Sequence, residues 1–263
     1  MKHSLPNKLE SVIQGYALAP VQTGHSDATV YKLEHPQNPD LFLKIQRSSN
    51  LGSLRFDADK LEWLHKRGIL VPQMLLFLEE DSFEYLLTTA ISGRDASNLW
   101  KQEEIPVLLE VLATNLKQLH ALEMTDCPFN QKLEVKIADA KSRVLENLVD
   151  ETDFDDVRIG KTIPETFQEL LETRPKSEDL VFAHGDYCLP NVMIHKLEFS
   201  GFIDLGRAGI ADRYQDLALM TRSLESDLNQ QFNGYSQYFL EQYGVLEPDE
   251  SKLEFYRLLD EFF

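Results

Sequence analysis

The hydrophobic pattern of the chain changes once, near Thr89, and this change limits the folds that the chain can adopt. Before that point, short segments rich in β-branched and apolar residues are bounded by turn residues, which is typical of strands. The first two of these segments enclose a turn rich in Pro and Asn and predict a hairpin. The strands are expected at 29–34, 41–46, 74–78 and 84–89, with a helix at 55–66. The N-terminal part is therefore predicted to be small and rich in β-structure.

After Thr89 the pattern becomes mainly helical. One apolar stripe recurs with helical spacing and predicts a long amphipathic helix, through Ile105, Leu108, Leu109, Leu112, Leu116 and Leu119. Short strands are expected at 180–183, 192–195 and 201–204, and helices from about residue 216 to the end. The sequence thus predicts an α+β chain, with a β-rich part at 1–91 and a larger helical part at 92–263.

Composition narrows the classes of function. The chain has 263 residues, 43% of them apolar, with no apolar run long enough for a membrane span and no apolar N-terminal leader. With two cysteines in no metal-binding pattern, we expect a cytoplasmic protein that has reduced thiols and does not enter a membrane. Lys and Arg number 26 against 44 Asp and Glu, and the net charge of −18 argues against nucleic acid as a partner.

The acidity is uneven along the chain. Residues 1–91 hold 9 basic and 11 acidic side chains, a net charge of −2, whereas residues 92–263 hold 17 and 33, a net charge of −16. This distribution suits a cationic substrate bound by the helical part. Solubility explains the same excess, and charge alone leaves both interpretations open.

Two apolar segments each end near an aspartate. In VFAHGDYCLPN (181–191), the apolar run ends at His184, and Asp186 and Asn191 follow five residues apart. Asp204 occurs in GFIDLGRAG, again after an apolar segment. Two carboxylates and an amide are suitable ligands for Mg²⁺, and phosphoryl transfer also needs a carboxylate that positions the attacking hydroxyl. A single Asp after a strand is often a helix cap or turn residue, but both motifs in this order match the kinase H-x-D-x-x-x-x-N and D-x-G spacing.

The motifs HGDYCLPN and SGFIDLGRAGIADRYQDLAL, together with DCPF (126–129) and the ending LLDEFF, resemble the aminoglycoside 3′-phosphotransferase family. The resemblance covers nearly the whole chain. It implies a two-lobed protein-kinase-like fold with a nucleotide-binding lobe at 1–91, and a helical lobe with the catalytic loop and the substrate site at 92–263. It implies ATP and Mg²⁺ as cofactors and transfer of the γ-phosphoryl group to the 3′-hydroxyl of kanamycin- or neomycin-type antibiotics. Antibiotic and nucleotide are then the partners of a monomer or weak dimer.

By this resemblance Asp186 is the catalytic base, Asn191 and Asp204 are the metal ligands, and His184 orders the loop. Lys44 lies among apolar residues of an expected strand, where burying an unpaired ammonium is costly. It resembles the kinase lysine that holds the nucleotide phosphates. The family's partner glutamate for that lysine falls at Asp57, whose side chain is one methylene shorter, so Asp59 or another acid stays an alternative.

For the nucleotide, the resemblance implies that Ser26, in the short loop Gly24-His25-Ser26, contacts phosphates. Phe42 stands where relatives stack an aromatic ring on adenine, although a strand Phe is often a core residue. The backbone groups of Thr89 and Ile91 are expected to pair with adenine.

For the substrate, acidic side chains suit the ammonium groups of an aminoglycoside. The acids expected at the site are Asp155, Asp156, Asp260, Glu261 and the terminal carboxylate of Phe263, with Arg207 and Arg222 also at family site positions. The alternative for the Asp155–Asp156 segment is a solvated loop. Relatives carry an Asp at the position of Leu189 and a Glu at that of Ser226, so the substrate spectrum stays open.

Two other functions remain as alternatives. A kinase of the same fold could act on another small alcohol such as choline, homoserine or a macrolide. The RAGIADRYQDLAL block and the LLDEFF end favour the antibiotic kinases. A non-catalytic, kinase-like binding module would be expected to lack Asp186, Asn191 or Asp204, and all three are present.

Overall fold

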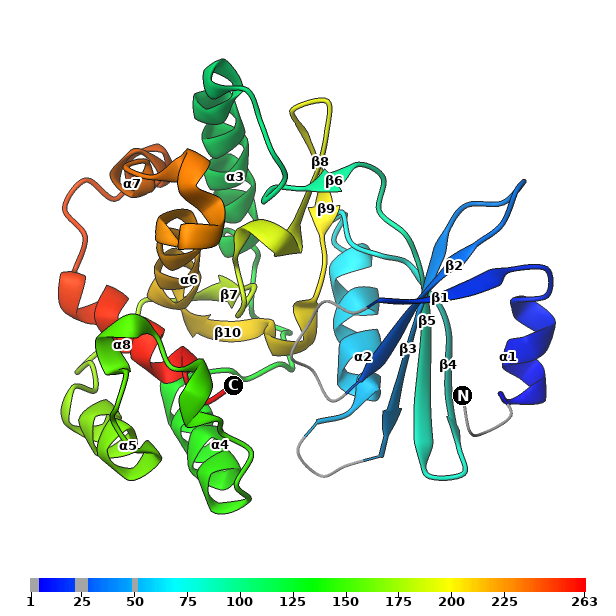
Figure 1. Ribbon diagram of the computed structural model, residues 1–263, viewed down its shortest axis with the longest axis horizontal. Coiled ribbons are helices and arrows are strands. Elements are labelled where there is room, and N and C mark those ends of the chain that lie inside the picture. The colour runs from blue at the N-terminus through cyan, green and yellow to red at the C-terminus, as the bar shows by residue number, and fades with distance from the viewer. Residues whose placement is uncertain (1–4, 22–27, 49–51) are drawn as a thin grey trace. The chain divides into compact units, whose positions relative to one another are not determined.

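The computed structural model describes residues 5–21, 28–48 and 52–263, and it divides into two compact units (Figure 1). The first unit comprises 1–92 and 200–206, and the second comprises 93–199 and 207–263. The helices are α1 (Asn7–Val12), α2 (Leu54–His65), α3 (Ile105–His120), α4 (Leu133–Leu145), α5 (Ile163–Glu172), α6 (Arg213–Glu225), α7 (Ser236–Tyr243) and α8 (Glu250–Asp260). The strands are β1 (Ala17–Val21), β2 (Thr29–Glu34), β3 (Leu41–Arg47), β4 (Met74–Glu80), β5 (Phe83–Thr89), β6 (Arg94–Asp95), β7 (Leu180–Ala183), β8 (Val192–His195), β9 (Glu198–Phe202) and β10 (Gly209–Asp212).

The first unit is built on a five-stranded antiparallel sheet in the order β1-β2-β3-β5-β4. The hairpin predicted from the Pro/Asn-rich turn is confirmed, because β2 and β3 pair across it. The four strands expected in this part are present, three of them slightly longer than predicted. The edge strand β1 and the short helix α1 were not predicted.

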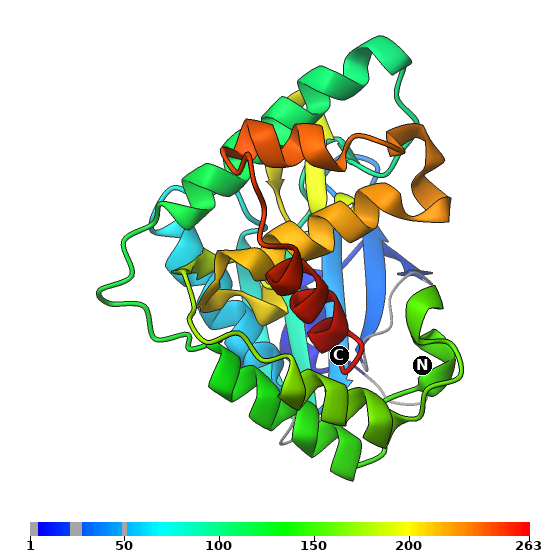
Figure 2. The same ribbon diagram turned by 90° about the vertical axis from the view of Figure 1, so that its left-hand side faces the viewer.

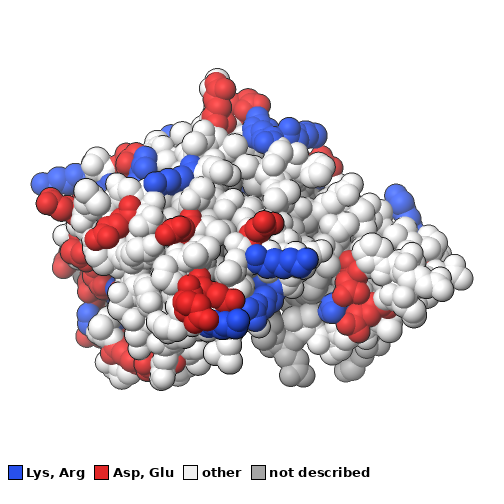
Figure 3. Space-filling view, turned by 90° about the horizontal axis from the view of Figure 1, so that it is seen from above, with Lys and Arg blue, Asp and Glu red and all other residues white. Residues whose placement is uncertain are grey.

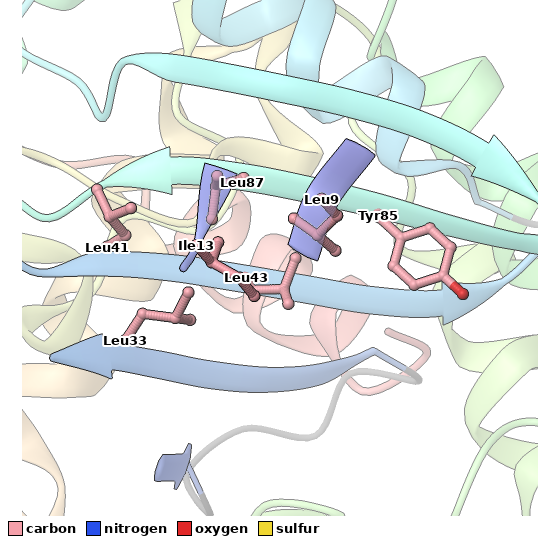
Figure 4. Close-up of a cluster of buried hydrophobic side chains, with 7 residues drawn as sticks. All are labelled: Leu9, Ile13, Leu33, Leu41, Leu43, Tyr85 and Leu87. Atoms are coloured by element: carbon pink, nitrogen blue, oxygen red, sulfur yellow. The ribbon is translucent and has the colours of Figure 1, made fainter. Parts of the chain in front are cut away.

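Strand alternation sorts the side chains of β3 onto two faces. One face carries a buried apolar cluster to which α1 contributes (Figure 4). Its members are Leu9, Ile13, Leu33, Leu41, Leu43, Tyr85 and Leu87. Because successive side chains of a strand point to opposite faces, Phe42 and Lys44 extend from the face opposite to this cluster.

Helix α2 packs against β4 and β5, and its first turn is fixed by a buried carboxylate of the sheet. Glu84 of β5 is 4% exposed, and it accepts hydrogen bonds from the Ser53 hydroxyl at 2.7 Å and from the Leu54 N–H at 2.6 Å. Ser53 also caps the helix, accepting from the Arg55 N–H. Since the first N–H groups of a helix have no partner within it, these contacts hold the turn that carries Asp57.

The second unit is a helical assembly. The stripe predicted on α3 is buried, and α3 packs against α7, while α6 packs against α8 (Figures 1 and 2). Helix α5 also contacts α8. Within the part of the chain that the structure describes, none of the helices combines the length and apolar character that crossing a bilayer requires.

Two small sheets position the loops of the predicted active site. β7 and β10 are antiparallel, with Ala183 opposite Gly209, and β6 pairs with β8, which neighbours β9. β9 ends at Phe202, whereas the sequence predicted a strand to Asp204. Asp204 has a φ of 56°, in the left-handed region, so a strand cannot continue through it.

Candidate active site

In the first unit, the structure brings together Lys44, Asp57 and Asp204. The Lys44 Nζ lies 2.9 Å from Oδ1 of Asp204 and 3.8 Å from Oδ2 of Asp57. Strand alternation directs Lys44 toward this pair, and the anchored first turn of α2 supplies Asp57. The acidic residue of α2 that faces Lys44 is therefore Asp57, which is one of the alternatives that the sequence left open.

The charges of this trio are interdependent. Burial disfavours the Lys44 ammonium, but the carboxylates of Asp204 and Asp57 outweigh burial, and the pKa of Lys44 is raised. Burial raises the pKa of Asp57, and the neighbouring ammonium groups of Lys44 and Lys60 only partly oppose it. The nearby carboxylates therefore favour the charged form of Lys44, and its ammonium can bind an anionic ligand at the Phe42–Lys44 face of the sheet.

A second lysine, which the sequence analysis missed, fixes the turn after Asp204. Lys60 is 4% exposed on α2 and its ammonium donates to the carbonyl of Gly206. A Cβ added at Gly206 would lie 3.1 Å from the Asp57 carboxylate, so the D-L-G turn approaches α2 closely. The signal for this residue was its position, one helical turn after Asp57, on the same face of the helix.

The other residues expected around the nucleotide also lie in the first unit where they are described. Phe42 is half-buried on the Lys44 face of β3. The Thr89 N–H donates to the carbonyl of Gln73 at 3.0 Å, so this N–H is already used within the first unit. Ile91 follows β5 and packs on the backbone of Gly201, where an added Cβ would meet its Cδ1 at 2.5 Å. Ser26 and its loop lie outside the described residues.

In the second unit, β7 leads into the loop that carries Asp186. A fully buried carboxylate, that of Asp216 on α6, accepts from the N–H groups of His184 at 2.7 Å and of Gly185 at 2.8 Å. His120 of α3 bonds to the same carboxylate at 2.8 Å. Burial opposes the charge of Asp216, but the hydrogen bond and charge of His120 and the contacts of His184 outweigh it, and the pKa of Asp216 is lowered.

Gly185 is required by the local geometry of this loop. Its φ is 83°, and a Cβ added there would lie 2.0 Å from the carbonyl oxygen of Arg207. The carbonyl of Gly185 accepts from Arg207 Nε at 3.1 Å and from Gln215 at 3.0 Å. The Nδ1 atom of His184 accepts from the N–H of Asp186 at 3.3 Å, so His184 orders the loop, as expected.

Asp186 and Asn191 are in direct contact. The Asn191 amide nitrogen donates to Oδ2 of Asp186 and to its carbonyl, both at 2.9 Å. Arg207 lies 3.7 Å from Oδ1 of Asp186. The side chain of Asp186 is 31% exposed, which leaves it accessible to a substrate.

The donor groups fit a magnesium ion in chemical type. Asn191 uses its amide nitrogen toward Asp186, so its amide oxygen, the atom that would bind a cation, is not used in that contact. The Asp204 side chain is 54% exposed. Within residues 5–21, 28–48 and 52–263, no group of three or more His, Cys, Asp or Glu side chains could hold a metal. Mg²⁺ is commonly held by one or two protein oxygens and by substrate phosphates, and Asn191 and Asp204 each carry an oxygen of this type.

Among the acids expected at the substrate site, Asp260 is held between two arginines. Its carboxylate accepts from both Arg207 and Arg222. Burial disfavours the charge of Asp260, but these guanidinium groups outweigh burial and its pKa is lowered. Asp260 is 13% exposed and Arg207 also contacts Asp186, so Arg207 connects the C-terminal helix to the catalytic loop.

The remaining predicted acids have different environments. Asp155 lies 3.5 Å from Arg222 and its N–H donates to Glu261, whose side chain is only 3% exposed. Asp156 is exposed to solvent. The ring of Phe263 lies 4.6 Å from the Lys136 ammonium and 5.5 Å from the guanidinium carbon of Arg207. Acidic side chains are spread over the face of the helical unit in the left part of Figure 3, interspersed with basic ones.

Comparisons with known proteins give one consistent result. The family model described as "Phosphotransferase enzyme family" matches residues 18–256. The chain is 40% identical to an aminoglycoside 3′-phosphotransferase of Niallia circulans over 98% of this chain and 97% of that protein. A crystal structure of an aminoglycoside 3′-phosphotransferase of type VIII matches with a TM-score of 0.89 at 37% identity, covering 97% of each chain. An aminoglycoside phosphotransferase of Streptomyces rimosus, solved with ADP and streptomycin, matches with a TM-score of 0.82 at 24% identity over 97% of this chain and 95% of that one. The predicted α+β, protein-kinase-like fold is thereby confirmed.

Proposed function

The chain belongs to the phosphotransferase enzyme family, among its aminoglycoside 3′-phosphotransferases, and we propose that it transfers the γ-phosphoryl group of ATP to the 3′-hydroxyl of kanamycin- and neomycin-type aminoglycosides. Such a reaction confers resistance to these antibiotics. The observation that carries the proposal is the contact between Asp186 and Asn191, in a loop that a buried aspartate holds in place. The similarity of the chain to an aminoglycoside 3′-phosphotransferase supports the same activity. The enzyme is expected in the cytoplasm, as a monomer or weak dimer without a nucleic-acid partner.

The nucleotide is bound at the Phe42–Lys44 face of the sheet in this proposal. Lys44 contacts the α- and β-phosphates, and Asp57 orients its ammonium. Phe42 stacks on adenine, and the backbone groups of Thr89 and Ile91 pair with its edge. Ser26 and the neighbouring N–H groups of its loop contact the phosphates. The ADP bound to the Streptomyces rimosus relative supports a nucleotide as one substrate.

Asn191 and Asp204 would each supply an oxygen to Mg²⁺ in this proposal, and the ion would supply positive charge to offset that of the phosphates. The left-handed backbone at Asp204, which Asp tolerates, turns the chain at the end of β9. The Lys44 ammonium lies 2.9 Å from Oδ1 of Asp204 and so holds this carboxylate in one position.

Asp186 orients the 3′-hydroxyl and accepts its proton as the bond from that oxygen to the γ-phosphorus forms, while the bond from the γ-phosphorus to the bridging oxygen breaks and ADP leaves. Asn191 supports this role by donating to Oδ2, and Arg207, at 3.7 Å from Oδ1, lies beyond hydrogen-bond distance of the oxygen proposed to meet the hydroxyl. The hydrogen bonds from His184 and Gly185 to Asp216 keep the loop in place, so little reorganisation is needed at the moment of transfer.

The antibiotic's ammonium groups meet the acids near the C-terminus in this proposal. Asp155, Asp156 and Asp260 offer exposed or partly exposed carboxylates, and the end of the chain at Phe263 adds its own. Arg207 and Arg222 hold Asp260 in one position. Glu261 is buried and contributes indirectly, because its side chain accepts a hydrogen bond from the N–H of Asp155 and so holds Asp155 in place.

A coupled assay of ADP release tests the proposal directly. Purified protein is incubated with MgATP and, separately, with kanamycin, neomycin, choline, homoserine and a macrolide. We expect turnover with the two aminoglycosides and background rates with the other alcohols. Turnover confined to choline, homoserine or the macrolide would assign the chain to another kinase activity. Background rates with every acceptor would support a non-catalytic binding module.

A further inference from the structure

The short turn at 156–158 has an inverted pattern of burial. Arg158 is 2% exposed, whereas its two apolar neighbours, Val157 and Ile159, are each 73% exposed. Hydrophobic burial would favour the opposite arrangement, with the aliphatic side chains inside and the guanidinium in water. The contacts of Arg158 therefore determine how this turn packs against the rest of the unit.

Those contacts are all with carboxylates. Arg158 Nη1 donates to Oε1 of Glu261 at 3.2 Å, and Nη2 pairs with Glu254. Nη1 also lies 3.7 Å from Oδ2 of Asp155. Glu254 lies in α8 and Glu261 directly follows it, so the single guanidinium attaches the turn to the C-terminal helix. A planar guanidinium can address two carboxylates at once, which an ammonium does less well.

The same helix end fixes the residue that begins the turn. The N–H of Asp155 donates to the Glu261 carboxylate at 3.2 Å, and the Asp155 carboxylate lies 3.5 Å from Arg222, which also holds Asp260. Glu261 is thus shared by Arg158 and Asp155. Removing the guanidinium would leave the buried Glu261 side chain without the hydrogen bond from Arg158, and the position of Asp155 would depend on the remaining contacts.

We propose that Arg158 is a positioning residue of the substrate site, which seats the turn on α8 and thereby sets where the carboxylates of Asp155 and Asp156 meet the ammonium groups of the acceptor. The proposal rests on the proposed function for the identity of the acceptor. Arg158 acts through Glu261 and Asp155, because its own side chain is buried.

The kinetic test compares Arg158→Met with Arg158→Lys and with the control Arg213→Met. Arg213 also pairs with a carboxylate, that of Asp179, and donates to the hydroxyl of Tyr243, and neither partner lies in the turn or in α8. We expect Arg158→Met to raise the kanamycin KM about fivefold or more, with kcat and the ATP KM within about twofold, the pattern of lost uniform binding. Arg158→Lys should recover part of the loss, and Arg213→Met should leave all three constants near wild type. An unchanged kanamycin KM in folded Arg158→Met overturns the proposal, and Arg158→Lys provides the same test if the Met variant does not fold.

Hydrogen exchange gives a readout that does not need catalysis. Arg158→Met should speed amide exchange in residues 150–160, including the Asp155 N–H that donates to Glu261, without changing exchange in residues 184–191. Equal exchange in the variant and wild type across 150–160 overturns the positioning role. If the wild type phosphorylates no aminoglycoside, the proposed function fails, while the exchange result still supports or overturns the seating of the turn by Arg158.

Discussion

The amide nitrogen of Asn191 lies 2.9 Å from Oδ2 of Asp186 and equally far from the backbone carbonyl of the same residue. One side chain therefore holds both the carboxylate and the backbone of its partner. Because one of the two acceptors is main chain, part of the link survives any substitution at 186. This allows the chemistry of Asp186 to be tested separately from the conformation of its loop.

Asp186→Asn should lower kcat by about two to four orders of magnitude, because a neutral amide can neither orient nor accept the proton of the hydroxyl as a carboxylate does. MgATP binding, measured by calorimetry, should change little. The matched control is Asp227→Asn, an exposed acid beyond α6, which should retain wild-type kcat. An Asp186→Asn enzyme with more than about a tenth of wild-type kcat would contradict the role of base.

Asp204→Asn should weaken MgATP binding by roughly tenfold or more, since it removes the carboxylate from the Lys44 ion pair and from the donor set proposed for the ion. Asn is chosen because it tolerates the left-handed backbone at this position, where Ala would add strain. Titration with ATP at several magnesium concentrations measures the effect. Unchanged nucleotide affinity at low magnesium would remove Asp204 from the metal site.

Kanamycin should be phosphorylated, and tobramycin, which lacks the 3′-hydroxyl, should not be phosphorylated at that position. The acids proposed for the substrate site would bind ammonium groups that both drugs carry, so tobramycin should act as a competitive inhibitor. Steady-state rates and NMR of the products distinguish the two outcomes. Rapid phosphorylation of tobramycin would overturn the 3′ assignment, whereas slow transfer to the 5″-hydroxyl of neomycin-type drugs is compatible with it.

Local patterns predicted much of the first unit. The period of a strand is a local property, so the strand at 41–46 could be predicted, but whether Phe42 belongs to the core stayed open until the structure placed it opposite the core leucines. The motif around Asp186 was likewise visible because a strand end and a metal-binding spacing are both short-range features. Helix α5 was missed although its start carries a signal, Thr162 and Glu165 in a capping box with Pro164 in the first turn.

Other parts of the site depend on contacts between distant segments. The burial of Arg158 cannot be predicted from the nearby sequence. Its immediate neighbours are apolar, and its partner Glu261 lies 103 residues later in the chain. Asp216 was present in the motif RYQDLAL, but its role as the acceptor for two N–H groups of the catalytic loop required the packing of α6 against β7. Tertiary packing, rather than propensity, decides such positions.

The stability of the protein should carry a pH dependence from Glu261. Burial, and then the charge and side-chain hydrogen bonding of the Asp155 carboxyl group, raise the pKa of Glu261 from 4.5 to about 8, although the Asp155 N–H and Arg158 partly oppose this. The folded state then holds this proton more tightly than the unfolded state, so the stabilisation is complete below about pH 4.5 and is lost as the pH rises to about 8. Relative to Glu261→Gln, which does not titrate, the wild-type Tm should fall between pH 5 and 8. A difference in Tm that is independent of pH would show that Glu261 titrates normally.

Asp260→Asn should raise the aminoglycoside KM about tenfold while leaving the ATP KM nearly unchanged, because a charge-assisted hydrogen bond is worth ~1.5–3 kcal/mol. The carboxylate of Asp260 neutralises Arg207 and Arg222, and without it these guanidinium groups would repel a polycationic acceptor. Substitution is preferable to deletion of residues 260–263, because Phe262 is fully buried against Phe167 and losing such a side chain costs ~3–5 kcal/mol of stability. The control is Asp179→Asn, which breaks the comparable pair with Arg213 at a site without substrate contacts in the proposal. Kinetics with each substrate varied in turn, on variants whose melting curves show a folded protein, give the result. If Asp260→Asn keeps its kanamycin KM, the acceptor must be bound by the Asp155–Asp156 turn, and the pair of arginines at Asp260 serves only to connect α8 to the catalytic loop.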